Sequence, residues 1–321
     1  MSPQDAAPQT ATRASAAFPP TDLKSAVREL CRDYSTEVTP ASALKIRSFG
    51  ELLPLGTDVY ITFLQGADYR DTVGLAVRLR REGFNPVPHV AARSIKDRAS
   101  LNDYLARSVG DAGVTQVLAI AGAPDKACGE FADSMQLLDT GLFEKNGIRT
   151  IGVAGHPESC NCCAEMALWD ALKWKSAFAA RSGLEVQIVT QFAFEAAPFL
   201  AYDRSLQREG IALPLHVGVP GVASLKALLA YAVSCGVGNS IDFLKRQAQH
   251  VTKLLLPSAP DKLLLDLAAY TLAEPQTRIA KLHFFSLGGL QKTAVWVNAV
   301  KDGRFDLKHD LSGFSIDSAV R

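Results

Sequence analysis

Apolar and β-branched residues recur along the chain in short runs separated by turn signals. Eight of these runs have the length and composition of buried strands; they span residues 34–38, 58–63, 86–91, 115–121, 150–154, 186–191, 213–218 and 282–287. Stretches with helical spacing of apolar positions lie between them, for example 72–83, 101–113 and 131–147. This alternation predicts parallel strands joined by right-handed crossovers.

Polar or Gly/Pro residues follow at least six of the apolar runs. They are Glu37, His89, the GAPD turn at 122–125, His156 to Glu158, Gln191 and Pro220-Gly221. The loops at the carboxyl ends of the strands build the active site of a (β/α)8 barrel. The pattern therefore predicts a (β/α)8 TIM barrel of the α/β class. A doubly wound sheet is the alternative, but it would need a glycine-rich dinucleotide loop after the first strand, and none follows Glu37.

The segment between the seventh and eighth predicted strands is unusually long. It contains helical patterns at 224–235, 240–255 and 261–274, so we expect extra helices there. Residues 1–20 are rich in Ala, Pro, Ser and Thr and predict a disordered leader. Residues 21–321 are predicted to form a single barrel domain. The tail after Asn298 is polar and interrupted by glycine, so we expect it to bury little.

Composition excludes several classes of protein. The chain of 321 residues is 48% hydrophobic and 21% charged, which is typical of a globular domain, and its net charge of +1 does not suggest a nucleic-acid partner. No apolar stretch is long enough to span a bilayer, and the leader lacks the apolar centre of a secretory signal. We therefore expect a cytoplasmic protein without a membrane partner.

Three of the six cysteines are close together in the sequence ESCNCCAE. Thiolates of Cys160, Cys162 and Cys163 could bind zinc. No second CxxC or spaced histidine pair completes a set of four ligands, however. We therefore predict no metal site and interpret these residues as reduced thiols near a loop-to-helix junction.

Six motifs on successive predicted strands resemble those of the methylenetetrahydrofolate reductases. In chain order they are STEVTP, NPVPHV, GVTQVLAIAGAPD, VAGHPESCN, VTQFAFEA and LHFFSL, and the resemblance spans about residues 30 to 298. It implies a barrel that holds FAD, takes electrons from NAD(P)H and interconverts 5,10-methylenetetrahydrofolate with 5-methyltetrahydrofolate. The cofactor would supply the redox chemistry and the protein its orientation and electrostatics.

The resemblance also implies roles for individual residues. Glu37 matches the family's general acid; opening the five-membered ring needs a proton on the departing nitrogen, and a carboxyl at an apolar strand end can hold one. The matching cofactor-binding positions are His89, Gly122, Ala123, Phe131, Ala132, His156, Asp170 and Lys175. The matching substrate-binding positions are Gln191, Leu225 and Phe285, with Gln191 the amide that pairs with the pterin.

Several positions depart from the family pattern. The Arg-Gly-Asp turn is Ala121-Gly122-Ala123, and Asp125 could supply the missing carboxylate. The tyrosine before Pro-Glu is His156. In the last strand the family's tyrosine is Phe285, and the aromatic residue after the seventh strand is Leu225.

Other interpretations remain open from the sequence alone. Hydride could pass directly from NADH to folate without flavin, or the barrel could bind folate and transfer a methyl or one-carbon group without redox chemistry. NADH and NADPH are not distinguished, and a homo-oligomer is possible. Purely structural roles also exist: Glu37 as a loop residue, Gln191 and His89 as satisfied strand residues, and Asp170 with Lys175 as one polar face of a helix.

Overall fold

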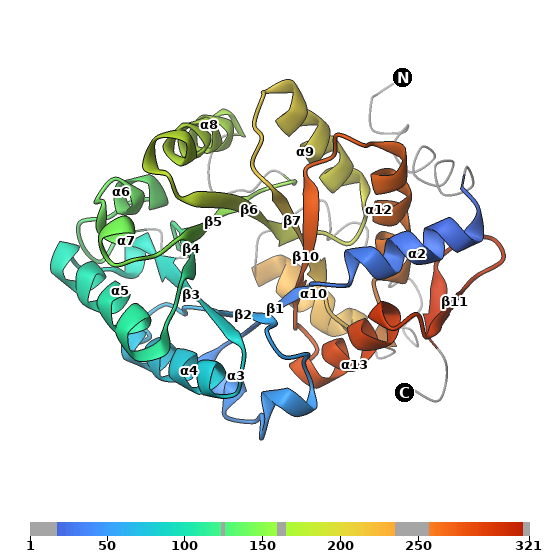
Figure 1. Ribbon diagram of the computed structural model, residues 1–321, viewed down its shortest axis with the longest axis horizontal. Helices are drawn as coiled ribbons and strands as arrows, with labels where there is room; N and C mark the ends of the chain where they lie inside the picture. Colours follow the sequence, from blue (N-terminus) through green and yellow to red (C-terminus); the bar gives the residue numbers. More distant parts are fainter. Residues whose placement is uncertain (1–17, 123–125, 159–164, 235–256, 317–321) are drawn as a thin grey trace. The chain divides into compact units, whose positions relative to one another are not determined.

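The computed structural model describes residues 18–122, 126–158, 165–234 and 257–316 (Figure 1). Eight strands of these residues form a closed parallel barrel in the order β1-β10-β7-β6-β5-β4-β3-β2. Their bounds are β1 Ser35–Val38, β2 Asp58–Ile61, β3 Asn85–Ala91, β4 Gln116–Ile120, β5 Thr150–Gly155, β6 Glu185–Phe192, β7 Leu215–Pro220 and β10 Ile279–Phe285. The predicted (β/α)8 fold is confirmed, and each predicted strand overlaps an observed one.

Contacts divide the chain into two compact units. Unit 1 comprises Met1–Tyr34, His156–Glu165 and Thr190–Arg321, and unit 2 comprises Ser35–Gly155 and Met166–Val189. We describe each unit by itself. Among the described residues of both, no helix is long and apolar enough to cross a membrane.

Four helices of unit 2 begin at residues whose side chains accept a hydrogen bond from the first turn. The helices of this unit are α3 Pro40–Ala43, α4 Tyr69–Arg81, α5 Arg98–Ala112, α6 Ser134–Leu138, α7 Leu142–Lys145 and α8 Glu165–Ser182, with 3-10 turns at Phe49–Glu51 and Ala92–Ser94. The four with side-chain caps are α3 to α6. The single helix predicted over 131–147 is wrong. Asp133 caps α6 through its side chain, and α6 already ends at Leu138. Gly141 then adopts a left-handed φ of 68° immediately before α7 begins.

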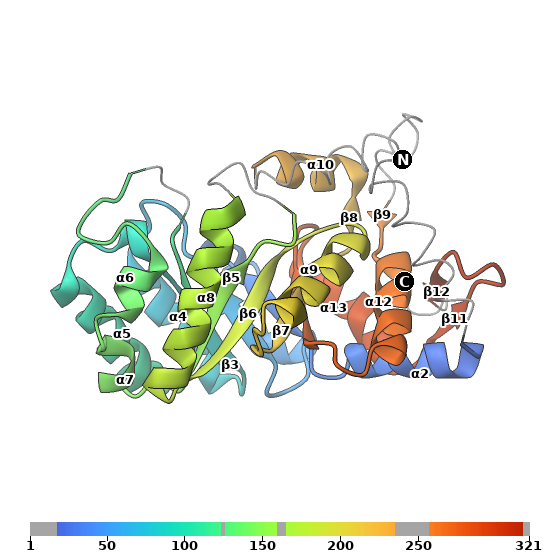
Figure 2. The same cartoon turned by 90° about the horizontal axis from the view of Figure 1, so that it is seen from above.

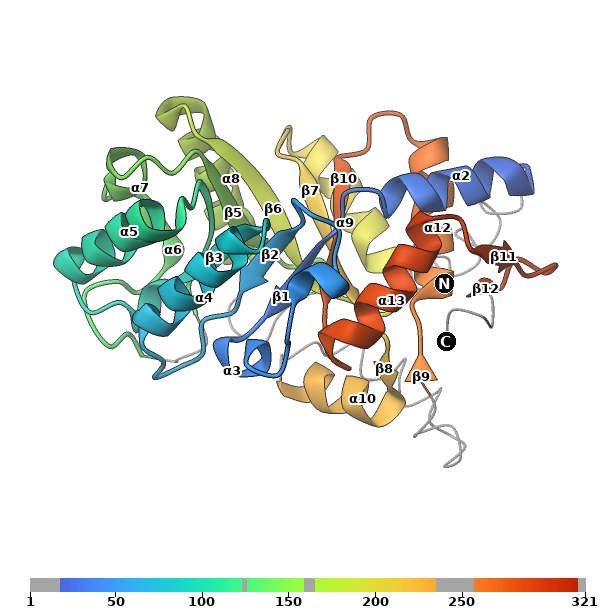
Figure 3. The same ribbon diagram turned by 60° about the horizontal axis from the view of Figure 1, so that its bottom comes forward.

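Unit 1 contains the extra helices expected before the last barrel strand. Helices α10 Leu225–Ser234 and α12 Asp261–Ala273 lie between β7 and β10, and β8 Ala223–Ser224 pairs with β9 Pro257–Ser258. The third helical pattern, at 240–255, lies outside the described residues. The other helices are α2 Pro20–Leu30, α9 Ala197–Arg208 and α13 Leu290–Lys301. Within unit 1, α10 and α2 lie at opposite ends (Figure 2), and α2 packs beside α12 and α13 (Figure 3).

The tail of unit 1 buries more than its sequence suggests. Strands β11 Phe305–Leu307 and β12 Phe314–Ile316 form an antiparallel pair, and the side chains of Phe305 and Phe314 are buried. The Phe314 ring stacks on Trp296 of α13 at a centroid distance of 5.6 Å. The expectation that this tail buries little is therefore wrong, because two well-spaced aromatic residues are enough to anchor a short hairpin.

Candidate active site

Strand register places Glu37 on the inward face of the barrel. Glu37 is the Cα partner of Tyr60, which is in turn the partner of Val87 on the next parallel strand. Paired residues of parallel strands point to the same side of the sheet. Tyr60 and Val87 belong to a buried cluster that also contains Leu118 and Val189. The half-buried Glu37 therefore faces the barrel interior near the carboxyl end of β1.

The loop after Glu37 is held by local caps and by α4. Thr39 and Ser42 form a capping box at the start of α3, with bonds of 3.0 and 2.9 Å in the two directions. The Arg78 guanidinium lies over the Phe49 ring at 5.0 Å and donates to three loop carbonyls, those of Ala43, Ile46 and Arg47. These contacts hold in place the segment that follows Glu37, the candidate acid.

Tyr60 and His89 form an aromatic pair inside unit 2. His89 is 6% exposed, and its ring meets the Tyr60 ring edge-on at a centroid distance of 6.0 Å. Gln187 Nε2 donates to the Tyr60 hydroxyl over 3.4 Å, and the Tyr104 hydroxyl donates to the His89 carbonyl over 3.1 Å. Burial, reinforced by the charge of Asp58, raises the pKa of Tyr60, so its hydroxyl stays protonated. Sequence reasoning missed Tyr60, whose only signal was its even spacing within an apolar run.

The other positions of unit 2 that are predicted to bind a cofactor differ in exposure. Gly122 follows β4 and has a φ of 93°, a conformation that favours glycine. Ala123 and Asp125 lie outside the described residues. On α8, Lys175 is buried whereas Asp170 is exposed. Five residues on a helix correspond to a rotation of about 140°. The interpretation of Asp170 and Lys175 as one polar helix face is therefore wrong.

In unit 1, Gln191 lies at the carboxyl end of β6 beside a tightly packed strand. Its Oε1 accepts from the Phe192 backbone N–H at 3.0 Å, and the Gly218 N–H of β7 donates to Thr190 Oγ1 at 2.8 Å. A Cβ on Gly218 would lie 2.5 Å from the Thr190 carbonyl oxygen and 2.8 Å from the Phe285 ring. Any side chain at position 218 would therefore clash with the backbone of β6 as well as with the Phe285 ring.

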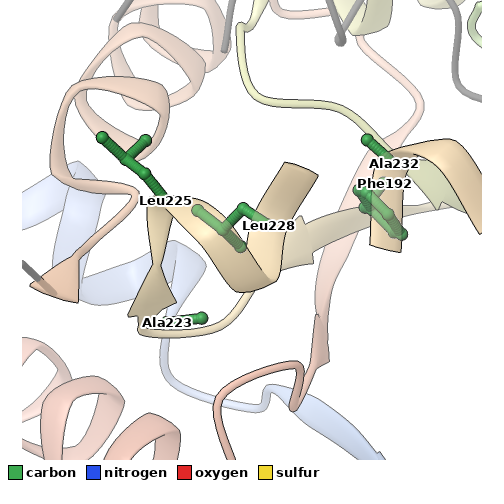
Figure 4. Close-up of a cluster of buried hydrophobic side chains, with 5 residues drawn as sticks. All are labelled: Phe192, Ala223, Leu225, Leu228 and Ala232. Carbon is green, nitrogen blue, oxygen red and sulfur yellow. The ribbon is translucent and has the colours of Figure 1, made fainter. Parts of the chain in front are cut away.

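Leu225 and Phe285 share one apolar cluster over the strand ends of unit 1. Leu225, at the start of α10, packs with Phe192, Ala223, Leu228 and Ala232 (Figure 4). Phe285 and Phe194 pack against this cluster, and the rings of Phe192 and Phe285 meet at 5.2 Å. The structure thus brings together Leu225 and Phe285, the two apolar positions predicted to bind substrate, and Gln191 directly precedes one member of their cluster.

His156 follows β5 directly and is the one predicted cofactor-binding residue outside unit 2. It is half-buried, and its backbone is hydrogen-bonded to the buried hydroxyl of Tyr202 on α9. Burial raises the pKa of Tyr202, so this hydroxyl also stays protonated. The cysteines Cys160, Cys162 and Cys163 lie outside the described residues. Elsewhere in the described chain, no three His, Cys, Asp or Glu side chains are grouped as metal ligands.

No known family model matches the chain. A similar solved structure is an uncharacterized Clostridium thermocellum protein that binds two copies of 5-methyl-5,6,7,8-tetrahydrofolic acid; identity is 14%, the TM-score 0.47, and coverage 87% of this chain and 98% of that one. An Aquifex aeolicus VF5 protein matches at 14% identity and a TM-score of 0.40, covering 74% and 99%. The carboxyl transferase domain of Rhizobium etli pyruvate carboxylase matches at 11% identity and a TM-score of 0.36. The match covers 83% of this chain and 51% of that one. With TM-scores of 0.47 or less, these similarities give no evidence about function, so function is inferred from the site itself.

Proposed function

We propose that the protein is a flavin-dependent oxidoreductase that interconverts 5,10-methylenetetrahydrofolate and 5-methyltetrahydrofolate with NAD(P)H. The observation that carries the proposal is the position of Glu37. It is an inward-facing carboxyl near the end of the first barrel strand, in register with Tyr60. Its motif is also the one that resembles the reductases' general acid. Active sites of this fold lie at the same strand ends.

Glu37 is assigned the proton that accompanies ring opening. The departing nitrogen of methylenetetrahydrofolate needs this proton before the carbon becomes an electrophilic iminium, and a positioned carboxylic acid can deliver it. In the opposite direction the carboxylate takes the proton back. The anchored loop after Thr39 keeps this side chain in place while the proton moves.

The residues of unit 2 suit FAD. The buried ammonium of Lys175 can pair with a phosphate, and the exposed carboxylate of Asp170 can accept from a ribose hydroxyl. His89 offers an imidazole held by its contact with Tyr60, and Gly122 lets the backbone approach a ring closely. Bound FAD would carry the hydride between nicotinamide and folate.

Unit 1 is assigned the folate. The Gln191 amide is oriented by the bond from the Phe192 N–H to its Oε1, and we assign its Nε2 to a pterin acceptor. The cluster around Leu225 and Phe285 supplies apolar area beside it. An aromatic heterocycle with hydrogen-bonding edges matches this combination of an amide and apolar rings.

An anaerobic absorbance experiment tests the proposal. Purified protein, supplied with FAD if needed, should show flavin absorbance that NADH bleaches and methylenetetrahydrofolate restores. Protein that binds no flavin yet oxidises NADH when folate is present would instead support direct hydride transfer. Folate binding without any nicotinamide turnover would support a non-redox one-carbon transferase.

A further inference from the structure

The loops after β3 and β4 are joined by main-chain hydrogen bonds. The Arg93 N–H donates to the Ala121 carbonyl at 2.9 Å, and the Cys128 N–H donates to the Arg93 carbonyl at 2.9 Å. Arg93 thus bridges the end of β4 and the returning part of the loop after it. These bonds involve only backbone atoms, so they do not depend on the Arg93 side chain.

A glycine allows the two loops to approach still more closely. A Cβ on Gly129 would lie 1.8 Å from the Lys96 carbonyl oxygen, so no other residue fits without moving the backbone. The neighbouring Glu130 N–H donates to that same carbonyl at 3.0 Å, and the Glu130 carboxylate accepts from the Arg98 N–H at 3.2 Å. The loop over 126–133 therefore rests directly on the chain over 92–98.

The Arg93 side chain fixes the far end of this loop. Its Nε donates to the Ala132 carbonyl at 2.9 Å, while the Ala132 N–H donates to Gln136 Oε1 at 2.7 Å. Ala132 is thus held on both sides of its backbone. The preceding side chain, Phe131, is buried, whereas Ala132 is exposed.

We propose that Arg93 is a positioning residue for FAD, acting through Ala132 and Phe131. The inference rests on the proposed function and on the family resemblance, in which these two residues match cofactor-binding positions. The partly buried Arg93 donates to the carbonyl of Ala132. This bond determines how far the loop over 126–133 extends beyond the ends of the strands. Helix α6 has its own cap, in which Asp133 Oδ1 accepts from two backbone N–H groups. Losing the Arg93 side chain should therefore displace the loop without unfolding α6.

The test compares FAD affinity and stability in matched variants. Arg93→Ala should raise the FAD Kd about tenfold, because FAD binding would then also have to order the loop that this charged hydrogen bond holds. Tm should change little because the bond lies at the surface. Arg93→Lys should recover part of the affinity because it keeps a cation and a donor. Arg70→Ala is the control, since this exposed arginine pairs with nearby Asp68 and should not affect FAD binding. Gly129→Ala should weaken FAD binding with Arg93 intact.

Flavin fluorescence quenching gives the Kd, and visible circular dichroism reports the environment of the bound ring. An Arg93→Ala protein with wild-type Kd and dichroism overturns the inference, and so does a fall in Tm without a change in affinity. These outcomes leave the proposed function intact, because wild-type protein would still bind FAD. Wild-type protein that binds no FAD overturns both.

Discussion

The two units differ in how they build their strand ends. In unit 2 the inward positions of neighbouring strands carry Glu37, Tyr60 and His89, which are groups able to hold or share protons. In unit 1 the corresponding region is dominated by an apolar cluster that includes Phe192 and Leu225. Apart from His156, the described cofactor-binding candidates belong to unit 2 and the substrate-binding candidates to unit 1. Unit 1 also carries imidazoles, since His216 and His283 are buried and the centroid of the His283 ring lies 4.9 Å from that of Phe285. The difference between the units is therefore the carboxyl of Glu37 in one and the extended apolar cluster in the other.

The two regions are also held by different forces. Hydrogen bonds from Arg78 and Arg93 to loop carbonyls support the polar region. Close packing, made possible by Gly218 and the Phe285 ring, supports the apolar one. Hydrogen-bonded loops depend on individual donors, whereas a packed cluster depends on volume. Substitutions that remove a single donor should therefore affect the polar region, whereas substitutions that change side-chain volume should affect the apolar region.

Glu37→Gln should have the largest effect and tests the chemistry of unit 2. Glutamine keeps the size of the side chain but cannot donate a proton as an acid. The folate half-reaction should slow by at least about a hundredfold, since a positioned acid contributes about 10²–10⁴-fold. Bleaching of the flavin absorbance by NADH should keep its wild-type rate. Rapid mixing measures both; a wild-type rate with folate would show that Glu37 is not the acid.

Asp203→Ala should destabilise the protein by about 3 kcal/mol, as expected when a buried charged hydrogen-bonding group is removed. The fully buried carboxylate of Asp203 on α9 accepts from four groups, namely the Tyr270 and Thr277 hydroxyls, the Arg278 N–H and the Gln207 amide. Urea unfolding gives the free energy. Asp203→Asn, which keeps the volume, should lose less, and a loss below about 1 kcal/mol for the alanine variant would contradict this account.

Gln191→Ala should weaken folate binding about tenfold, the cost of one lost hydrogen-bonding partner. FAD affinity should not change, because the assigned FAD contacts belong to other residues. Calorimetric titration of both ligands, with Tm as a check on folding, measures the difference. Equal folate affinity in the two proteins would return Gln191 to a purely structural role at the end of β6.

Asp97→Ala should have the smallest effect, and it depends on pH. Asp97 caps α5, and the backbone hydrogen bond from Ser100 lowers the pKa of its carboxyl. A lowered folded-state pKa contributes stability above the ordinary aspartate value of about 3.9, which is lost as pH falls through the folded-state pKa. The variant should have a lower Tm than wild type at pH 7, and the difference in Tm should decrease as the pH is lowered toward 3. Melting curves from pH 7 to pH 3 measure this, and a constant difference would exclude the charge as its cause.

The sequence predicted the barrel well because its strands are short, buried and rich in β-branched residues. The break before Gly141 has a local signal, a glycine that adopts a left-handed conformation, which the helical spacing of the apolar residues concealed. The hairpin that buries Phe305 and Phe314 could not be predicted, since it depends on contact with Trp296 outside the local pattern. Glu37 was identifiable from its motif at a strand end. Tyr60 and Arg93 were not, because their partners lie far along the chain and only the folded strands and loops bring them together.

The close packing around Gly218 restricts which substitutions this part of unit 1 can accept. The Phe285 ring occupies the space that a Cβ at residue 218 would need. A Cβ there would also lie 2.5 Å from the Thr190 carbonyl oxygen, which is a backbone atom, so a smaller residue at position 285 would remove only one of the two clashes. Residue 218 is therefore confined to glycine by the backbone of the neighbouring strand as well as by the ring, and substitutions of Phe285 leave that restriction in place.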